Sequence, residues 1–235
     1  TSRPYISLTA NIMEHFGASV EMVDCAGKLT IKITSRGYTP TSLTLSADWS
    51  GAAYFAVAYA IAQSGRAVAE RYTLRATIGT SQADEAILDI LHSVGAKIAI
   101  EEREVRFMPS ERLRAFRYDA SDTPDLIPTL AILALFCEGI SRIGGVHRLA
   151  NKESNRTEAI VENLLALGAR VAIENDELVI EGVATLHPAP LRSHNDHRMV
   201  MAMAIVSLFM EHAPTIDCVA CVAKSYPYFF EQLKG

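Results

Sequence analysis

An internal repeat constrains the fold of this chain more than any other feature of its sequence. Three segments share one plan, in which an amphipathic helix ends at Gly-Ala and two short apolar strands follow, joined by a tight polar turn. These segments span residues 11–33, 86–107 and 159–180. The apolar spacing changes from helical to alternating at the glycine, as expected where a glycine caps the end of a helix. The sequence therefore predicts three copies of one helix–hairpin unit.

A second set of segments alternates with the first. Each starts with an aspartate, continues as a nearly all-apolar helix and passes through a turn into a strand. The three aspartates are Asp48, Asp125 and Asp196. Together the two sets predict a repeat of about 75 residues with the order βαβαββ. Two repeats are whole, over about 43–108 and 119–182, and a third begins near 189 and stops after its second helix.

The repeat also predicts how the chain divides. Residues 1–33 supply only the closing half of another unit, and the turn formers of 34–40 lead into a strand that we expect to end near Ser46. We therefore expect residues 1–45 to be the C-terminal remnant of another domain. Residues 46–235 would form one α/β (α+β) domain of two whole βαβαββ units and the start of a third. Because the opening half of the first unit is missing, we expect this chain to be the C-terminal part of a longer protein.

Composition and charge restrict the partners of the chain. Hydrophobic residues make up 49% and charged residues 21%, which is ordinary for a folded protein. The formal net charge of −5 gives no general attraction to nucleic acid or to an anionic membrane. The longest apolar stretches run to about 12 residues, too few to span a bilayer. We expect a cytoplasmic protein with no nucleic-acid or membrane partner, in which any anion site is a local cluster of cations.

Two motifs have spacings that could serve redox chemistry or a metal. Cys218 and Cys221 form Cys-Val-Ala-Cys, but no second pair exists, and an extended strand would point their thiols to opposite faces. His194, Asp196 and His197 lie close together, yet no further cluster with zinc-ligand spacing accompanies them. We therefore expect no metal and interpret the cysteines as reduced core thiols. The four cysteines are Cys25, Cys137, Cys218 and Cys221.

Charged residues gather at the predicted starts of helices. Asp125 precedes an apolar helix, where aspartate often serves as the N-cap. Lys152 and Arg156 stand four residues apart at the start of another helix, where two cations repel each other and oppose the helix dipole. The simplest interpretation is a solvated first turn, but a phosphate or carboxylate at the helix N-terminus would explain the cations better. Arg198 and Lys224 hold comparable places in the next repeat, which favours one shared anion site.

Four motifs carry a resemblance to a known family. In this order, the chain contains PDLIPTLAILALF, NKESNRTEAIVENLLALGA, NDHRMVMAMAI and AKSYPYFF. Two further segments precede them, SRPYISLTANIM at residues 2–13 and ADWSGAAYF at residues 47–55. These segments resemble the 5-enolpyruvylshikimate-3-phosphate synthases, enolpyruvyl transferases of the shikimate pathway of aromatic amino-acid biosynthesis. The resemblance covers the whole chain but only about the second half of a family member. It implies an inside-out, barrel-like α/β architecture of βαβαββ units.

The resemblance also implies a reaction and the residues that perform it. The enolpyruvyl group of phosphoenolpyruvate would move to the 5-hydroxyl of shikimate 3-phosphate, with release of phosphate and without metal or organic cofactor. Asp125 matches the carboxylate that takes the hydroxyl proton, and Glu153 the one implicated in proton transfer at the methylene. The matches for substrate binding are Arg156, Arg198, Lys224 and His197 for phosphoenolpyruvate, and Ser2, Tyr5, Asp125 and Lys152 for shikimate 3-phosphate.

Departures from the family pattern leave alternatives open. Trp49 replaces a small residue, and Arg148 stands where many members carry an asparagine. The N-terminal site residues of the family have no counterpart here, so we expect the chain alone to be inactive and its missing N-terminal half to be a partner. One alternative is an enolpyruvyl transferase that acts on another acceptor, such as UDP-N-acetylglucosamine. Another is a non-catalytic anion-binding or scaffolding fragment.

Overall fold

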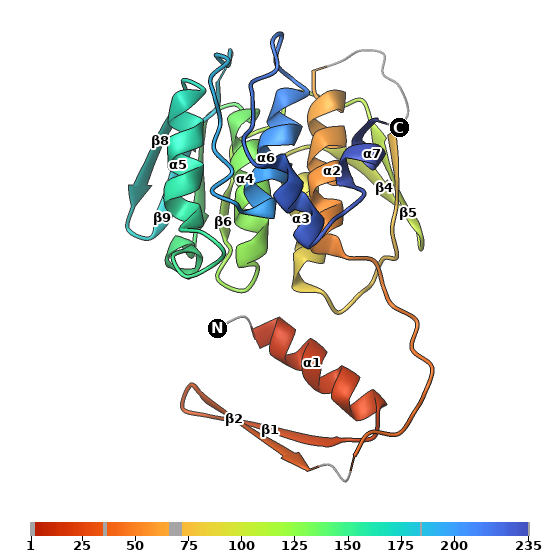
Figure 1. Ribbon diagram of the computed structural model, residues 1–235. Helices are drawn as coiled ribbons and strands as arrows, with labels where there is room; N and C mark the ends of the chain where they lie inside the picture. The colour runs from red at the N-terminus through yellow and green to blue at the C-terminus, as the bar shows by residue number, and fades with distance from the viewer. Residues whose placement is uncertain (1–2, 35–36, 66–71, 184, 235) are drawn as a thin grey trace.

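The computed structural model describes residues 3–34, 37–65, 72–183 and 185–234. Its N-terminal part is one helix packed on a hairpin, drawn in red and orange in Figure 1, and the rest is a larger α/β body. The helix–hairpin part consists of α1 (Arg3–His15), β1 (Ser19–Cys25) and β2 (Lys28–Thr34). The hairpin pairs from Ser19 opposite Thr34 to Cys25 opposite Lys28. The division at residue 45 stays a prediction.

The larger body follows the predicted repeats. The elements of the first are α2 (Trp49–Gln63), β3 (Tyr72–Arg75), η1 (Ala83–Ala86), α3 (Ile87–Ser93), β4 (Lys97–Ile100) and β5 (Glu104–Met108). Those of the second are β6 (Arg117–Asp119), η2 (Pro124–Leu126), α4 (Ile127–Leu135), β7 (Ile140–Gly144), η3 (Val146–Leu149), α5 (Arg156–Ala166), β8 (Arg170–Glu174) and β9 (Glu177–Glu181). Those of the third are α6 (His197–Ser207), η4 (Val219–Lys224) and α7 (Phe229–Lys234). The elements labelled η are 3₁₀ helices.

The second repeat forms the complete predicted unit. Its sheet has the order β6-β7-β9-β8, in which β6 runs parallel to β7 while β9 is antiparallel to both of its neighbours. The connection between these parallel strands contains α4 and is long enough for the crossover of a βαβ unit. The hairpin of β8 and β9 turns through Asn175 and Asp176, both with positive φ, which these two residue types tolerate. The expected βαβαββ plan is therefore confirmed here.

The first repeat lacks the strand that the sequence predicted. Its sheet contains β3, β5 and β4, and residues 37–48 adopt neither helix nor strand. The strand expected to end near Ser46 is therefore wrong. Leu43 and Leu45 of this segment lie in solvent, with Leu45 79% exposed. A strand is stable only where its backbone groups find partners, and an apolar alternation cannot show whether a partner is available.

The third repeat also lacks strands that the sequence predicted. The strands predicted near residue 189 and after α6 amount to one isolated parallel bridge between Leu191 and Ile216. Cys218 and Cys221 consequently lie outside any strand, because Cys218 directly precedes the 3₁₀ helix η4 and Cys221 lies within it. The interpretation of all four cysteines as core thiols is wrong for Cys25 and Cys218, which are exposed, whereas Cys137 and Cys221 are buried.

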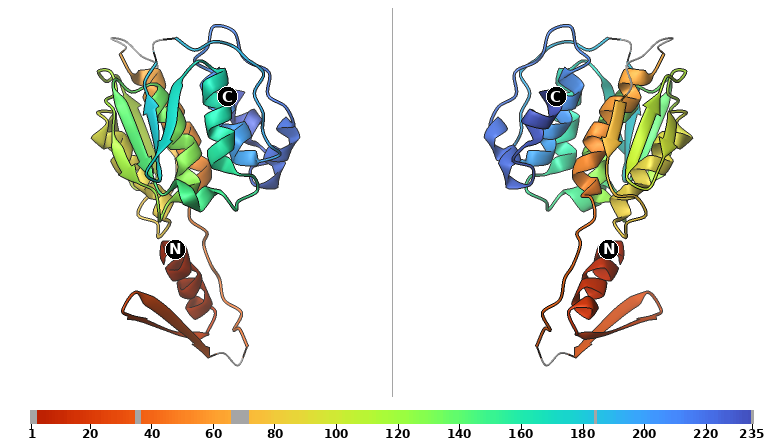
Figure 2. Two further views of the ribbon diagram at one scale, coloured as in Figure 1. Left: turned by 90° about the vertical axis from the view of Figure 1, so that its left-hand side faces the viewer. Right: turned by 90° about the vertical axis from the view of Figure 1, so that its right-hand side faces the viewer.

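Buried helices form the core, and the sheets lie outside them. Every residue of α4 is buried, as expected for a helix that is apolar all round. Helices α2 and α6 are almost as fully buried, and the three pack against one another. Figure 2 shows the strands as an outer layer beside these helices. The inside-out α/β arrangement is confirmed, without a closed barrel among the described residues. No helix in this part of the chain is long and apolar enough to cross a membrane.

Candidate active site

The repeats bring the starts of several helices to one side of the larger body. Figure 1 shows α2 and α5 beginning at the end that faces α1. Asp48 caps α2, Asn155 caps α5 and Asp196 caps α6, each through its side-chain oxygen. Asp125 lies in η2, directly before α4, and makes no cap hydrogen bond there. The side chain of Asp125 is therefore available for other contacts.

Three cations converge on Asp125. The guanidinium of Arg156 donates to Oδ1 at 2.8 Å, and the Nζ of Lys152 lies 3.3 Å from the same oxygen. The guanidinium of Arg198 donates to Oδ2 at 3.0 Å. These cations come from the loop before α5, the first turn of α5 and the first turn of α6. The sequence predicted one shared anion site for four cations. Three of them, Lys152, Arg156 and Arg198, come together around Asp125, across two repeats.

The three cations set the protonation of Asp125. Burial raises the pKa of this carboxyl, but the positive charges of Arg198, Lys152 and Arg156 outweigh burial and hold the pKa below its usual range. The side chain is 22% exposed, so the carboxylate is partly shielded from water but still within reach of a ligand. In the absence of other anions, Asp125 is a stabilised carboxylate and a weak base.

Arg156 is held by a second aspartate that sequence reasoning did not place in the site. Its Nε donates to Oδ2 of Asp196 at 2.7 Å, and the two side chains are only 1% and 0% exposed. The other oxygen of Asp196 accepts the backbone N–H of Arg198 at 2.9 Å. Asp196 also accepts the hydroxyl of Ser154 at 3.1 Å. One buried carboxylate therefore fixes both the guanidinium of Arg156 and the helix that carries Arg198.

Glu153 stands at the open side of the same arginine. Its carboxylate pairs with the NH2 group of Arg156, three residues away, and is 43% exposed. Arg156 thus contacts Asp125, Glu153 and Asp196 at the same time. The arrangement couples two partly exposed carboxylates, which can exchange protons, to cations that can bind an anion.

His197 lies beside this network with one nitrogen unpaired. Burial lowers the pKa of its imidazole, and the charge of Arg198 lowers it further, so the ring is neutral at pH 7. Its Nδ1 is buried and has no hydrogen bond within the described residues. The nearest carboxylate oxygen, on Asp196, is 3.9 Å away, which is too far for a hydrogen bond. A buried ring nitrogen without a partner is uncommon and can accept or donate to a ligand.

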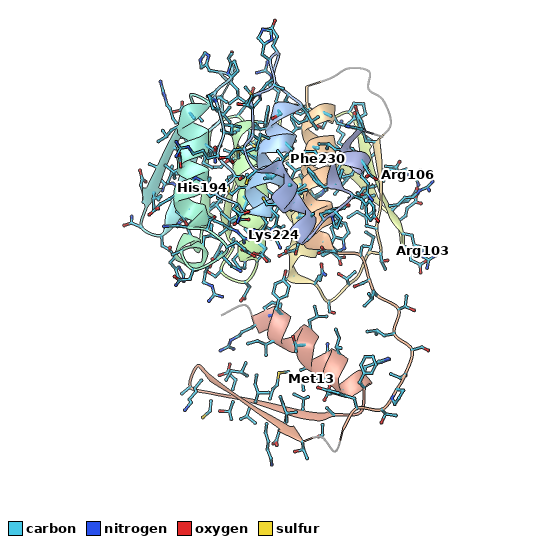
Figure 3. All side chains as sticks on the ribbon, viewed as in Figure 1. Met13, Arg103, Arg106, His194, Lys224 and Phe230 are labelled. Atoms are coloured by element: carbon cyan, nitrogen blue, oxygen red, sulfur yellow. The ribbon has the colours of Figure 1, made fainter. Side chains whose placement is uncertain are left out.

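Lys224, labelled in Figure 3, reaches the site from another element. It ends η4, is exposed, and donates from Nζ to the carbonyl of Asn195 at 2.6 Å. That carbonyl belongs to the loop directly before Asp196 and His197. Lys224 therefore lies next to the cluster, although no contact with Asp125 is among those described.

Tyr5 approaches the same side from α1. Burial raises the pKa of its phenol, and the nearby carboxylate of Asp84 raises it further. Asp84 is fully buried, accepts the hydroxyl of Ser50 at 2.5 Å, and has its own pKa raised by burial. The N–H of Arg3 donates to Asp122 at 3.3 Å, which ties the start of α1 to the loop before Asp125. Ser2, the other residue expected from this segment, lies outside the described residues.

Several residues at the site were not identifiable from sequence. Asp196 was recognisable only as a helix cap, because Asp48, Asp125 and Asp196 occupy equal places in the repeat. Asp84 lies outside every motif of the sequence, and Ser50 lies within ADWSGAAYF, where nothing distinguished it from its neighbours. Trp49, the unusual residue of its segment, is a core side chain whose indole N–H donates to the carbonyl of Thr77 at 3.1 Å. Among the described residues, no group of three or more His, Cys, Asp or Glu side chains is arranged to hold a metal ion.

Comparison with known proteins gives a consistent result. A family model described as EPSP synthase (3-phosphoshikimate 1-carboxyvinyltransferase) matches residues 1–233. The chain is 33% identical over 237 residues to a 3-phosphoshikimate 1-carboxyvinyltransferase of Methanococcus aeolicus, covering 100% of this chain and 53% of that protein. It is 35% identical over 243 residues to one from Methanospirillum hungatei, covering 99% of this chain and 53% of that protein. The chain spans about half the length of these curated relatives.

Solved structures show the same fold. EPSP synthase from Acinetobacter baumannii superimposes with a TM-score of 0.77 at 24% identity, over 96% of this chain and 53% of that one. The enolpyruvyl transferase NikO from Streptomyces tendae superimposes with a TM-score of 0.72 at 21% identity, over 98% and 52% of the two chains. At these identities the structures support the fold alone.

Proposed function

Because this chain belongs to the EPSP synthase family, whose model matches residues 1–233, we propose that it supplies one half of an enolpyruvyl-transfer site. The reaction moves the enolpyruvyl group of phosphoenolpyruvate to the 5-hydroxyl of shikimate 3-phosphate. A new carbon–oxygen bond forms to that hydroxyl, the bond to the phosphate oxygen breaks, and phosphate leaves. The reaction occurs in the cytoplasm and needs no nucleic-acid or membrane partner.

The observation that supports this most directly is the convergence of Lys152, Arg156 and Arg198 on Asp125 beside Glu153. Phosphoenolpyruvate carries a carboxylate and a phosphate, and shikimate 3-phosphate carries the same two groups. Charge-assisted hydrogen bonds from arginine and lysine are the strongest that a protein can offer such anions. The same cluster holds carboxylates that can take and return protons, which the transfer also requires.

Each residue of the cluster has a proposed role. Asp125 takes the proton of the 5-hydroxyl, and Glu153 transfers a proton at the methylene carbon. Phosphoenolpyruvate binds to Arg156, Arg198, Lys224 and the unpaired nitrogen of His197; shikimate 3-phosphate binds to Lys152, Asp125, Tyr5 and Ser2. The 1–45 segment belongs to the family's other domain in this proposal, and α1 brings Tyr5 to the site from there.

Substrate binding changes the basicity of Asp125. In the free site its charge is neutralised by three cations, so it is a poor base. Phosphate and carboxylate groups of the substrates compete with Asp125 for Arg198 and Lys152. As these cations turn to the substrates, the pKa of Asp125 rises, because the contacts that stabilised its charged form are weakened. Asp125 becomes an effective base only when both substrates are present.

The remaining contacts come from the part of the protein that lies beyond this chain. The relatives are about twice as long as the matched region, and a site that binds several anionic groups gains affinity from cations on both halves. Closure of the two halves around the substrates would also exclude water and align the reacting atoms. We therefore propose that this chain acts together with an N-terminal half.

The test joins this chain, by fusion or mixing, to the unmatched part of the Methanococcus aeolicus enzyme and measures phosphate release from both substrates. Turnover should fall about a hundredfold or more in Asp125→Asn, as it commonly does when a general base is lost. Asp89→Asn, on the exposed side of α3, is the matched control and should retain activity. An Asp125→Asn protein with unchanged turnover per folded molecule would contradict the proposed role. Binding of both substrates without phosphate release would favour a non-catalytic anion-binding function.

A further inference from the structure

The proposed reaction gives no role to the Cys-Val-Ala-Cys segment, residues 218–221. An extended strand would separate the two thiols, but the structure forms a closed turn instead. The backbone N–H of Cys221 donates to the carbonyl of Cys218 at 3.0 Å. Cys218 is the residue before η4, and Cys221 lies within it. The reason for discounting redox chemistry at this pair therefore does not hold.

The turn brings the two cysteines within the range of a disulfide. A turn closed by such a hydrogen bond places its first and fourth Cα atoms within about 7 Å of each other. Disulfides join Cα atoms about 4.4 to 6.8 Å apart. Cys218 begins the turn with φ 47°, a left-handed conformation that is unusual for a residue other than glycine and stores local strain.

The two thiols differ in access. Cys218 is exposed, whereas Cys221 is only 7% exposed. Burial raises the pKa of the Cys221 thiol, and the charge of Lys224 only partly opposes this effect. An external oxidant therefore reaches Cys218 first, and Cys221 is positioned to react in a second step. An exposed thiol beside a sheltered one is a common arrangement of dithiols that form disulfides reversibly.

We propose that Cys218 and Cys221 are a redox modification site, which closes to an intramolecular disulfide and thereby controls the position of Lys224. Lys224 follows Cys221 by one turn at the end of η4, and its Nζ contact with Asn195 at 2.6 Å joins η4 to the loop before α6. A covalent bond across the first turn of η4 changes the geometry of that short helix. The effect on substrate binding rests on the proposed function of Lys224, whereas disulfide formation itself does not.

The oxidant is a small-molecule disulfide such as oxidised glutathione. The thiolate of Cys218 attacks one sulfur of oxidised glutathione, forming a mixed disulfide and releasing one reduced glutathione. The Cys221 sulfur then attacks the sulfur of Cys218 and releases the second reduced glutathione. The two cysteines lose two protons and two electrons in total, and one molecule of oxidised glutathione is reduced to two thiols.

The direct test is to incubate the folded 235-residue chain with oxidised glutathione, block the remaining thiols and map the peptides by mass. We expect one peptide in which Cys218 and Cys221 are linked and two hydrogens are lost. Cys221→Ser should stop at a glutathione adduct on Cys218, and Cys218→Ser should leave Cys221 unmodified. Cys25→Ser is the control, because Cys25 is exposed but has no neighbouring cysteine in its turn, and the linked peptide should persist. A wild-type chain that accumulates the adduct on Cys218 without closing it, or that links the pair only in urea, would overturn the proposal.

A second measurement separates the modification from its consequence. Hydrogen exchange of oxidised and reduced chains should differ in residues 219–226 and agree in the β6–β9 sheet. Titration with phosphoenolpyruvate of the active two-part assembly should then show weaker binding in the oxidised form. If the disulfide forms and alters exchange in 219–226 while the assembly is inactive in both states, the redox site stands and the proposed function fails. Unchanged exchange in 219–226 would refute control of Lys224.

Discussion

Replacing Asp196 by alanine should destabilise the chain far more than the equivalent change at Asp48. Both aspartates cap a buried helix, accepting a backbone N–H at 2.9 Å in α6 and 3.0 Å in α2. Losing a cap costs about 1 kcal/mol. Asp48 is exposed and does little else, so Asp48→Ala should lower the free energy of unfolding by about that amount.

Asp196 also neutralises a buried arginine. Its Oδ2 lies 2.7 Å from Nε of Arg156, and neither side chain is more than 1% exposed. Removing one partner of a buried ion pair costs about 3 to 5 kcal/mol. Arg156 keeps Asp125 and Glu153, so the lower end of this range applies. With the lost cap included, Asp196→Ala should lower the free energy of unfolding by about 4 kcal/mol.

Urea unfolding can separate the two contributions. With a slope near 2 kcal/mol per molar urea, the midpoint should fall by about 2 M in Asp196→Ala and about 0.5 M in Asp48→Ala. Asp196→Asn keeps a good cap residue but loses the charge, and should lie between them, about 3 kcal/mol below wild type. If the losses of stability in Asp196→Ala and Asp48→Ala agreed within about 0.5 kcal/mol, the buried ion pair would contribute nothing to the stability of the fold.

Two further effects should be measurable by urea unfolding. The pKa of Asp125 is lowered in the folded state, so the stability that its charge contributes is complete above its unfolded pKa of about 4 and is lost as pH falls below that value. Below pH 4, the free energy of unfolding should therefore fall less steeply with pH in Asp125→Asn than in the wild type. Equal slopes in the two proteins would contradict the stabilisation of Asp125 by the three cations. Gly95 and Gly168 both end amphipathic helices with positive φ, but a Cβ on Gly168 would lie 2.7 Å from the ring of His187 whereas one on Gly95 meets nothing. We expect Gly95→Ala to cost about 1 kcal/mol and Gly168→Ala about 1 kcal/mol more, and equal losses would show that His187 moves freely.

The features that sequence predicted are those decided by local physics. The helix–hairpin units end their helices at Gly17, Gly95 and Gly168, all with positive φ, as the change of periodicity indicated. The buried helix α4 follows from an uninterrupted apolar run. The cluster of Lys152, Arg156 and Arg198 was also predictable, because cations at helix starts are unfavourable without an anion.

The features that sequence missed depend on partners elsewhere in the chain. The alternation of residues 41–46 is that of a strand, yet no described strand pairs with it. Cys218 and Cys221 lie within the apolar run 218–223, which would be extended if it were paired. No ladder is described there beyond the isolated bridge at Ile216, and the backbone turns instead. Asp196 and Asp48 look alike in sequence because a cap is a local property, whereas a buried ion pair depends on a residue 40 positions away.

Asp125 leads to an unusual prediction for the chain by itself. Removing the charge of this side chain should strengthen anion binding, although the same change should lower turnover of the two-part assembly about a hundredfold or more. The carboxylate holds Lys152 at 3.3 Å and Arg198 at 3.0 Å, so an incoming anion must compete with it. We expect the wild-type chain to bind phosphoenolpyruvate no more tightly than about 1 mM, which corresponds to about 4 kcal/mol.

In Asp125→Asn the amide can still occupy the position, but it no longer neutralises the two cations. Arg156 keeps its contacts with Asp196 and Glu153, so the fold should persist. Recovering one charge-assisted contact is worth about 1.5 kcal/mol, which is about tenfold in affinity. Titration of both proteins with phosphoenolpyruvate, followed by calorimetry or NMR, measures this difference, and Asp89→Asn controls for the change in net charge. An Asp125→Asn chain that binds no tighter than wild type would mean that Asp125 does not compete with the substrate, and that its basicity is not controlled by substrate binding.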